Sequence, residues 1–200
     1  AGAVFFMIFL SPALTMRLIA EEQKLGTMEL LMTSPLKDFE IVLGKFLAAL
    51  SIIIVMIIGT FFYPIILIIF GVPDFGPIFT GYLGLILYSS ATLSVGIFAS
   101  SLSSNQLVSL VVGSGILSFL TFIDFVSSRV TGVFGTILNE LQLGGSFSLF
   151  DSSSFGIAEG GHFADFARGI INFYDIIFYI SISAIFIVLT IFSLESRRWR

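Results

Sequence analysis

Long stretches without a charged residue constrain this chain more than any other feature. Of its 200 residues, 56% are hydrophobic and 11% are charged, whereas about 25% of the residues in ordinary globular domains are charged. A helix needs about 20 apolar residues to cross the hydrocarbon core of a bilayer. The charge-free stretches are long enough for about five such helices. The sequence therefore predicts an all-α fold, a polytopic transmembrane helical bundle.

The predicted spans form a single transmembrane domain over residues 1–200. The third and fourth spans share one uncharged tract, which residues 100–106 divide because Ser and Asn side chains compete for backbone hydrogen bonds and favour a turn. The opening apolar run is slightly short for a complete span, so we expect its beginning to lie upstream. The five spans are expected at 1–19, 42–70, 78–100, 106–125 and 175–194.

The positions of Lys and Arg indicate how these spans are oriented. When five spans alternate, seven of the nine basic residues fall on one side, and only Arg129 and Arg168 fall on the other. Cytoplasmic loops carry the excess of Lys and Arg. This predicts a cytoplasmic C-terminus, a cytoplasmic coupling segment at 20–38 and an extracytoplasmic loop at 126–174.

Polar residues recur at helical spacing near the end of the predicted outer loop. Their steps of three, three, four and three predict one helix with a polar stripe, lying in the interface or against its neighbours. These residues are His162, Asp165, Arg168, Asn172 and Asp175.

Small residues recur about four positions apart in the third and fourth spans, and this spacing favours close helix packing over a role in lining a substrate path. They are Ser90, Ser94, Gly96, Ser100, Ser109, Gly113 and Ser118.

The sequence contains no pattern that predicts catalysis or a metal site. The chain has no Cys and a single His, His162, which leaves no ligand set for a Cys-based or multi-histidine cluster. Gly44-Lys45-Phe46 lacks the upstream Gly and the Ser or Thr of a phosphate-binding loop. No nucleophile-elbow pattern accompanies Ser152 to Ser154, and His162 is expected to be solvated. We expect no enzyme activity, no catalytic or metal-binding residue and no cofactor bound directly.

The cytoplasmic segment is too regular for a plain loop. Glu21 and Glu22 are expected in a helix that extends the first span, and Gly26 can end that helix because glycine readily adopts the left-handed C-terminal conformation. Thr27 is the predicted N-cap of a second, short helix. Glu29 in its first turn suits the positive end of the helix dipole.

Apolar residues give this second helix one hydrophobic face. Met28, Leu31 and Met32 lie on it, with Leu30 beside them. Ser34-Pro35 is predicted to cap and begin a further helix that enters the membrane as an amphipathic ramp. Exposed Met and Leu suit docking into a groove of a partner protein. A helix that rests on the membrane surface explains the pattern equally well.

Four groups of residues carry a more specific likeness. They are Glu21-Glu22, Gly26 to Leu31, Thr33 to Pro35, and Gly44-Lys45. They resemble the cytoplasmic loop of ABC-2-type permeases, and the closest likeness is to the gliding-motility-associated branch of that family. The end of the chain is similar to the end of those permeases, in the stretches 165–175 and 194–199 and at Tyr179.

The resemblance implies a permease of six spans that forms a homodimer or heterodimer and binds a separate ABC ATPase subunit. ATP and Mg²⁺ would be bound by that partner, and an auxiliary extracytoplasmic subunit is compatible with the family. The implied location is the cytoplasmic (inner) membrane of a bacterium or archaeon, and no nucleic acid is involved. The residues implied in ATPase coupling are Glu21, Glu22, Gly26, Thr27, Glu29, Leu30, Leu31, Ser34 and Pro35.

A secondary transporter and a non-transporting scaffold are the two alternatives to an ABC permease. A secondary transporter usually needs an ionisable residue at mid-membrane depth, and the predicted spans contain none there. A non-transporting membrane scaffold or anchor for a partner complex remains open on sequence grounds.

Overall fold

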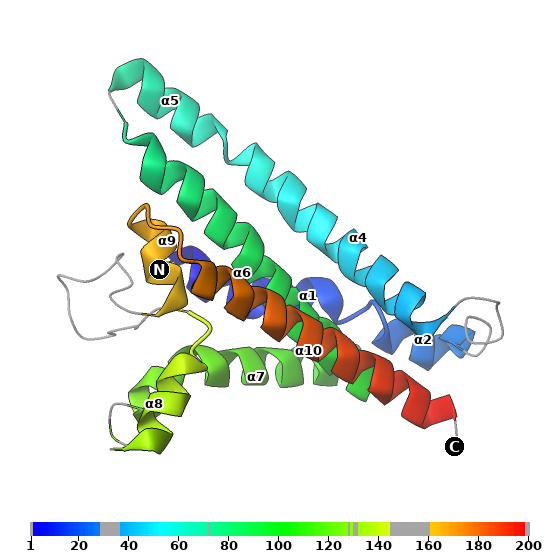
Figure 1. Ribbon diagram of the computed structural model, residues 1–200. Coiled ribbons are helices and arrows are strands. Elements are labelled where there is room, and N and C mark those ends of the chain that lie inside the picture. The colour runs from blue at the N-terminus through cyan, green and yellow to red at the C-terminus, as the bar shows by residue number, and fades with distance from the viewer. Residues whose placement is uncertain are drawn as a thin grey trace.

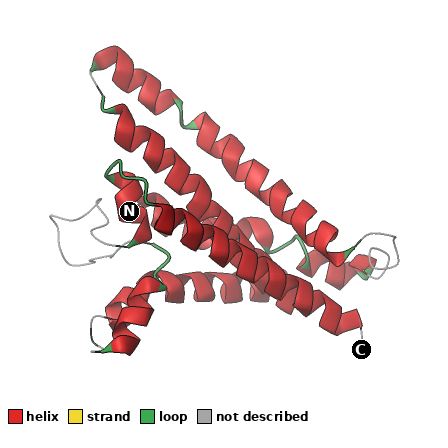
Figure 2. Ribbon diagram, viewed as in Figure 1, coloured by secondary structure: helices red, strands yellow, loops and turns green. Residues whose placement is uncertain are grey.

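A computed structural model of the chain describes residues 2–28, 37–71, 73–127, 129, 132–144 and 161–198. The described part contains helices and connecting loops but no strand (Figure 2). The helices are α1 (Gly2–Thr15), α2 (Ala20–Leu25), α4 (Asp38–Gly59), α5 (Phe62–Phe70), α6 (Phe75–Leu102), α7 (Gln106–Ser127), α8 (Val133–Glu140), α9 (His162–Ala167) and α10 (Phe173–Arg198).

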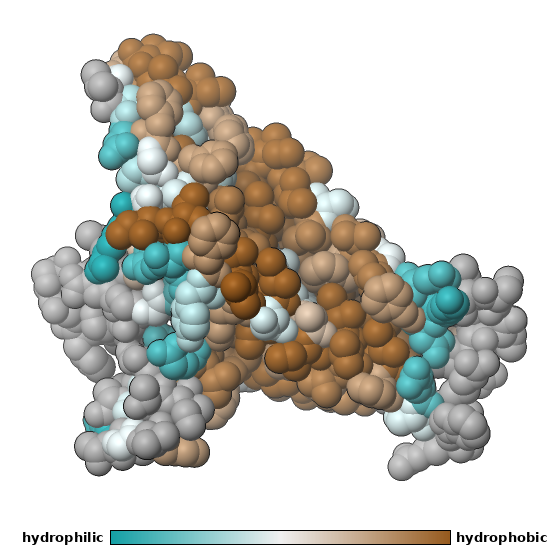
Figure 3. Space-filling model, viewed as in Figure 1, coloured by the Kyte–Doolittle hydropathy of each residue, from teal (hydrophilic) through white to brown (hydrophobic). Residues whose placement is uncertain are grey.

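Within the described residues, five helical segments are long and apolar enough to cross a membrane, which confirms the predicted all-α polytopic fold class. Hydrophobic side chains cover the middle of the molecule, and hydrophilic ones gather near α2 and near α9, at opposite ends of the bundle (Figures 1 and 3). The five segments are Val4–Leu25, Asp38–Phe70, Phe75–Leu102, Gln106–Ile123 and Phe173–Ser196.

Helix α6 is the central helix of the bundle. It contacts α1, α4, α7, α9 and α10, and nearly all of its residues from Tyr88 to Ser101 are buried. A Cβ added at Gly96 would lie 2.2 Å from Thr15 Oγ1 of α1, and one added at Gly113 of α7 would lie 3.1 Å from Pro12 Cβ. For these two glycines, the predicted role in close helix packing is confirmed.

The second span is interrupted between α4 and α5. Pro64 has no N–H, so it cannot donate to the carbonyl of Thr60, four residues earlier. That carbonyl instead accepts hydrogen bonds from the Tyr63 N–H at 3.0 Å and from the Tyr82 hydroxyl of α6 at 3.1 Å. Proline therefore breaks the helix, and a neighbouring tyrosine satisfies the backbone group that the break leaves open.

The predicted helix through 162–175 is wrong. Helix α9 ends at Ala167, Gly169 has a left-handed φ of 89°, and α10 starts at Phe173. A Cβ at Gly169 would lie 3.3 Å from the Pro77 ring, so glycine allows both the turn and the close approach to α6. The predicted outer loop 126–174 also contains two helices, α8 and α9, in its described part.

His162 is buried, so the expectation that it is solvated is also wrong. Its Nδ1 lies 2.6 Å from Asp175 Oδ1, its Nε2 lies 3.2 Å from the Glu140 carbonyl oxygen, and its ring stacks on Phe178 with centroids 3.9 Å apart. Only 7% of the histidine is exposed. His162 and Asp175 of the polar stripe thus join α8, α9 and α10, whereas Arg168 is exposed.

Candidate coupling segment

Helix α2 is a short helix at the end of the bundle that also holds the C-terminus of the chain (Figure 1). Its C-cap is Gly26, which has a left-handed φ of 72° and donates its N–H to the Gln23 carbonyl at 3.4 Å. The predicted helix end at Gly26 is therefore confirmed. Helix α2 does not simply continue the first span, because turn residues 16–19 separate it from α1.

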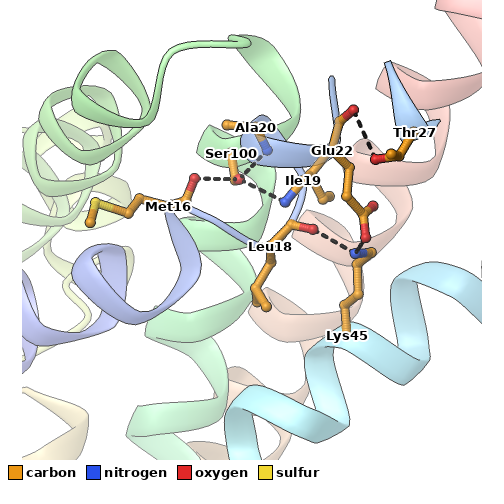
Figure 4. Close-up of polar contacts among 8 residues, drawn as sticks. All are labelled: Met16, Leu18, Ile19, Ala20, Glu22, Thr27, Lys45 and Ser100. Atoms are coloured by element: carbon orange, nitrogen blue, oxygen red, sulfur yellow. Dashed lines mark hydrogen bonds and ion pairs between the residues drawn. The ribbon is translucent and has the colours of Figure 1, made fainter. Parts of the chain in front are cut away.

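Ser100 of α6 occupies this separation (Figure 4). Its hydroxyl donates to the Met16 carbonyl at 3.1 Å and accepts from the N–H groups of Ile19 at 3.2 Å and Ala20 at 3.1 Å. In a continuous helix, the Ala20 N–H would bond to the Met16 carbonyl directly. The serine hydroxyl is inserted into that hydrogen bond and uses its one donor and both acceptor sites.

Lys45 of α4 holds the other side of the junction (Figure 4). Its Nζ donates to the Leu18 carbonyl at 2.5 Å and lies 2.6 Å from Glu22 Oε1 of α2. The Lys45 side chain is 16% exposed and the Glu22 side chain 33% exposed. The ion pair thus sits at the edge of the bundle, where partial burial reduces screening by solvent.

Gln23 adds a third connection between α2 and α6. Its Nε2 donates to the Ser101 carbonyl at 3.2 Å. Together with Ser100 and Lys45, this bond fixes α2 to two membrane-spanning helices, α4 and α6.

A model of the ABC-2 family of transporter proteins matches residues 1–194. The chain belongs to the ABC-2 transporter family. No curated protein and no solved structure gives a significant match. As an ABC-2 protein, the chain is an integral membrane permease component of an ABC transporter, and membership implies association with an ABC ATPase.

The structure places four of the residues assigned to ATPase coupling in this ABC-2 permease. Glu21 is half-buried, Glu22 pairs with Lys45, and Gly26 and Thr27 are exposed. These four therefore lie together on and just after α2. The other five, Glu29, Leu30, Leu31, Ser34 and Pro35, lie outside the described residues.

Two expectations for the residues after α2 are wrong. Thr27 is itself helical, so it lies inside a helix and does not have the non-helical conformation of an N-cap, and its hydroxyl donates to the Glu22 carbonyl of α2 at 3.3 Å. Met28 was expected on an exposed face, yet it is 6% exposed and packs in the main hydrophobic core. Its flexible thioether side chain fills space between helices instead of facing a partner.

The helix that enters the membrane begins later than predicted. Lys37 has extended φ and ψ angles of −82° and 143°, so α4 starts at Asp38 and not at Pro35. The Glu40 carboxylate accepts the Lys37 N–H at 3.1 Å, which satisfies a backbone donor at the helix start. Val42 and Phe46 of the predicted apolar face lie in the core, whereas Phe39, predicted on the same face, is exposed.

Sequence reasoning missed the two residues that hold α2. Ser100 stood out only as a small residue at the start of a Ser-rich turn, and Lys45 only as part of the Gly44-Lys45 group, with no partner assigned to it. The signal that could have identified Lys45 is its place within α4, seven residues after the helix begins, where a charge needs a partner. No comparable signal marks Ser100, because its partners lie 80 and 81 residues away in the chain.

An apolar groove of about 700 Å³ lies elsewhere in the permease, between α4–α5 and α6. Its lining consists of Ile, Leu, Phe, Pro and Tyr side chains from these helices and Ile176 of α10. The groove thus offers no charged group that could bind a polar substrate. Among the described residues, no group of three or more His, Asp or Glu could hold a metal ion.

Proposed function

We propose that this chain is the membrane-spanning permease subunit of an ABC-2-type exporter, and that it couples ATP hydrolysis by a separate ATPase subunit to movement of a substrate across the membrane. The coupling segment is 20–38, on the cytoplasmic side together with the C-terminus. ATP and Mg²⁺ bind to the ATPase.

One observation supports this proposal above the others. Helix α2 lies at one of the two polar ends of the bundle, and the side chains of Lys45 on α4 and Ser100 on α6 fix it in place. Leu25 at its end is 68% exposed, and exposed leucine beside charged residues suits an interface with a polar rim. A helix attached in this way can receive a contact from a partner and pass a displacement to the membrane-spanning helices.

The finer assignments are part of the same proposal. The motif residues of the cytoplasmic segment support the gliding-motility-associated branch of the family. The excess of Lys and Arg on the side of α2 supports insertion in the cytoplasmic (inner) membrane of a bacterium or archaeon. The permease would act as a homodimer or heterodimer, together with an auxiliary extracytoplasmic subunit where the system has one.

The proposal is tested by variants of the coupling segment in the intact complex with its ATPase. Glu29→Lys replaces attraction to a basic or donor-rich groove on the ATPase with repulsion. It also places a cation near the positive, N-terminal end of the predicted helix, where it opposes the helix dipole. Leu31→Ala removes apolar area worth about 1–3 kcal/mol if that side chain is fully buried in the complex. We expect both variants to insert in the membrane and to lose co-purification with the ATPase and stimulation of ATP hydrolysis.

Ser153→Lys in the predicted outer loop is the matched control and should change neither property. If the two coupling variants keep full ATPase binding and stimulation, the docking proposal is wrong. The non-transporting scaffold would then be the better account of the chain.

A further inference from the structure

The junction between α1 and α2 is an interruption in what is otherwise one membrane span. Residues Val4–Leu25 form one helical segment that is long enough to cross a bilayer and apolar over most of its length, yet the helix breaks at 16–19. None of the residues from Met16 to Ile19 is Pro or Gly. Pro12 lies one turn earlier within α1, and its carbonyl still accepts the helical bond from the Met16 N–H at 2.8 Å, so proline does not place the break at 16–19. Insertion of a side chain into the hydrogen-bond ladder is the other common cause of a sharp kink.

Ser100 provides that insertion from α6. Its hydroxyl takes the place of the direct bond between the Met16 carbonyl and the Ala20 N–H, with distances of 3.1 Å to each. Ser100 is fully buried, so water does not compete for these groups. A backbone group that is buried among helices without a hydrogen-bond partner would be costly, and the serine therefore stabilises the broken form of the helix.

Lys45 stabilises the same broken form from α4. The bond from Nζ to the Leu18 carbonyl holds the turn, and the ion pair with Glu22 Oε1 holds the first turn of α2. One side chain thus binds both halves of the junction. The second carboxylate oxygen, Glu22 Oε2, is buried without a hydrogen-bond partner, so Lys45 carries the stabilisation of this carboxylate.

We infer that Ser100 and Lys45 are the positioning residues of the coupling segment, which keep the α1–α2 junction bent and transmit displacements of α2 to α6 and α4. This inference rests on the proposed function for its role in coupling, although the bend itself does not depend on an ATPase. Further along the same interface, the Ser11 and Thr92 hydroxyls lie 2.8 Å apart and Gly96 abuts Thr15. Helix α1 is therefore held against α6 along its length, and a displacement of α2 would act on α6 and α4 through the contacts at the junction.

The bend is tested first without the ATPase. The chain contains no Cys, so nitroxide labels can be attached at Leu25→Cys on α2 and Val111→Cys on α7, two exposed positions. In Ser100→Ala, the Ala20 N–H can bond to the Met16 carbonyl directly, and α1 and α2 join into one helix. The expected result is a shifted and narrowed distance distribution between the labels.

Ser101→Ala is the matched control. Ser101 is equally buried, but its hydroxyl donates within its own helix, to the Phe98 carbonyl at 2.7 Å. The distance distribution should therefore match that of the parent protein. An unchanged distribution in Ser100→Ala, or the same shift in both variants, would overturn the inference about the bend.

Coupling is tested next with the full complex and its ATPase. Lys45→Met removes both bonds at the edge of the bundle and Lys45→Arg keeps a cation and donors. We expect Ser100→Ala and Lys45→Met to bind the ATPase normally and to lower permease-stimulated ATP hydrolysis roughly tenfold, within the range of known coupling effects. Lys45→Arg should retain most of the stimulation, and Ser101→Ala all of it.

The outcomes separate this inference from the proposed function. If the parent permease does not bind or stimulate the ATPase, the proposed function fails, while the bend can still be measured. If the parent stimulates the ATPase and both Ser100→Ala and Lys45→Met stimulate it equally, the positioning role is wrong. Should Ser100→Ala fail to insert, the comparison of Lys45→Met with Lys45→Arg still decides the question.

Discussion

Single residues between α1 and α6 show how this protein brings helices together in lipid. Lipid tails are as apolar as the helix surfaces, so the hydrophobic effect does not drive helices together within the bilayer, and close packing and polar contacts do so instead. Gly96 lets the two backbones approach, and the Ser11 hydroxyl lies 2.8 Å from that of Thr92 across the same interface. Thr15 also donates to the carbonyl of Ser11 in its own helix, at 2.8 Å. Small size and local hydrogen bonding at these positions therefore matter more than hydrophobicity.

Gly96→Ala should destabilise the permease by about 1–3 kcal/mol, because the added Cβ would overpack the interface with α1. Its position would be 2.2 Å from Thr15 Oγ1. Thermal unfolding in detergent measures the loss.

Gly115→Ala on α7 is the matched control, since nothing lies within 4 Å of a Cβ at that position. It should be neutral or stabilising by up to about 1 kcal/mol, because alanine favours the helix. Equal unfolding temperatures for the two variants would contradict the close packing of α1 on α6.

Helices α8, α9 and α10 meet through polar groups at the end of the bundle opposite α2. His162 bonds to Asp175 and to the Glu140 carbonyl, and the Tyr174 hydroxyl donates to Glu140 Oε2 at 2.5 Å. Thr80 of α6 donates to the Phe166 carbonyl at 2.7 Å, which joins α9 to the centre of the bundle. These contacts join the first turn of α10 to α8 and α9.

Asp175→Ala should cost about 1–3 kcal/mol, because it leaves His162 Nδ1 buried without a partner. The double variant His162→Phe with Asp175→Ala replaces both partners by apolar groups. Such a double replacement can leave the free energy of unfolding nearly unchanged. We therefore expect the double variant to lose at least about 1 kcal/mol less than the sum of the two single variants. Strictly additive losses in thermal unfolding would show that the two side chains do not stabilise each other.

The elements differ in how far the sequence could predict them. The spans followed from hydropathy, because a chain in hydrocarbon must form helices wherever long apolar stretches occur. The end of α2 followed from Gly26, whose left-handed conformation is a local property. The polar stripe at 162–175 led to a wrong prediction of one continuous helix. Its spacing fits a helix, but the left-handed Gly169 interrupts the chain there. The spacing of polar residues tests whether a segment fits one helix, and it does not detect a turn at a single glycine such as Gly169.

The candidate site was predictable only in part, for the same reason. Motif residues led to the proposed coupling segment, yet the side chains that hold its described part come from distant helices. Ser100 reaches Ala20 across 80 residues of chain and Lys45 reaches Leu18 across 27. Met28 likewise lies in the core because of the surrounding helices. Such tertiary contacts leave no periodic signature in a single sequence.

At the scale of the whole molecule, the two ends of the bundle carry different structural features. One end carries α2, whose attachment to α4 and α6 passes through Ser100 and Lys45. The other end carries α9 and the polar contacts around His162. A displacement applied to α2 would therefore reach α6, the helix that contacts both ends through α1, α9 and α10. Our account predicts that the ATPase binds only at the end that carries α2.

Site-specific photocrosslinking in intact membranes tests that claim most directly. A photoreactive amino acid at Leu31 in the coupling segment is compared with one at Phe134, an exposed residue of α8 at the opposite end. The account predicts that Leu31 crosslinks to the ABC ATPase and Phe134 does not. Crosslinks from Leu31 to lipid alone, or from Phe134 to the ATPase, would contradict it.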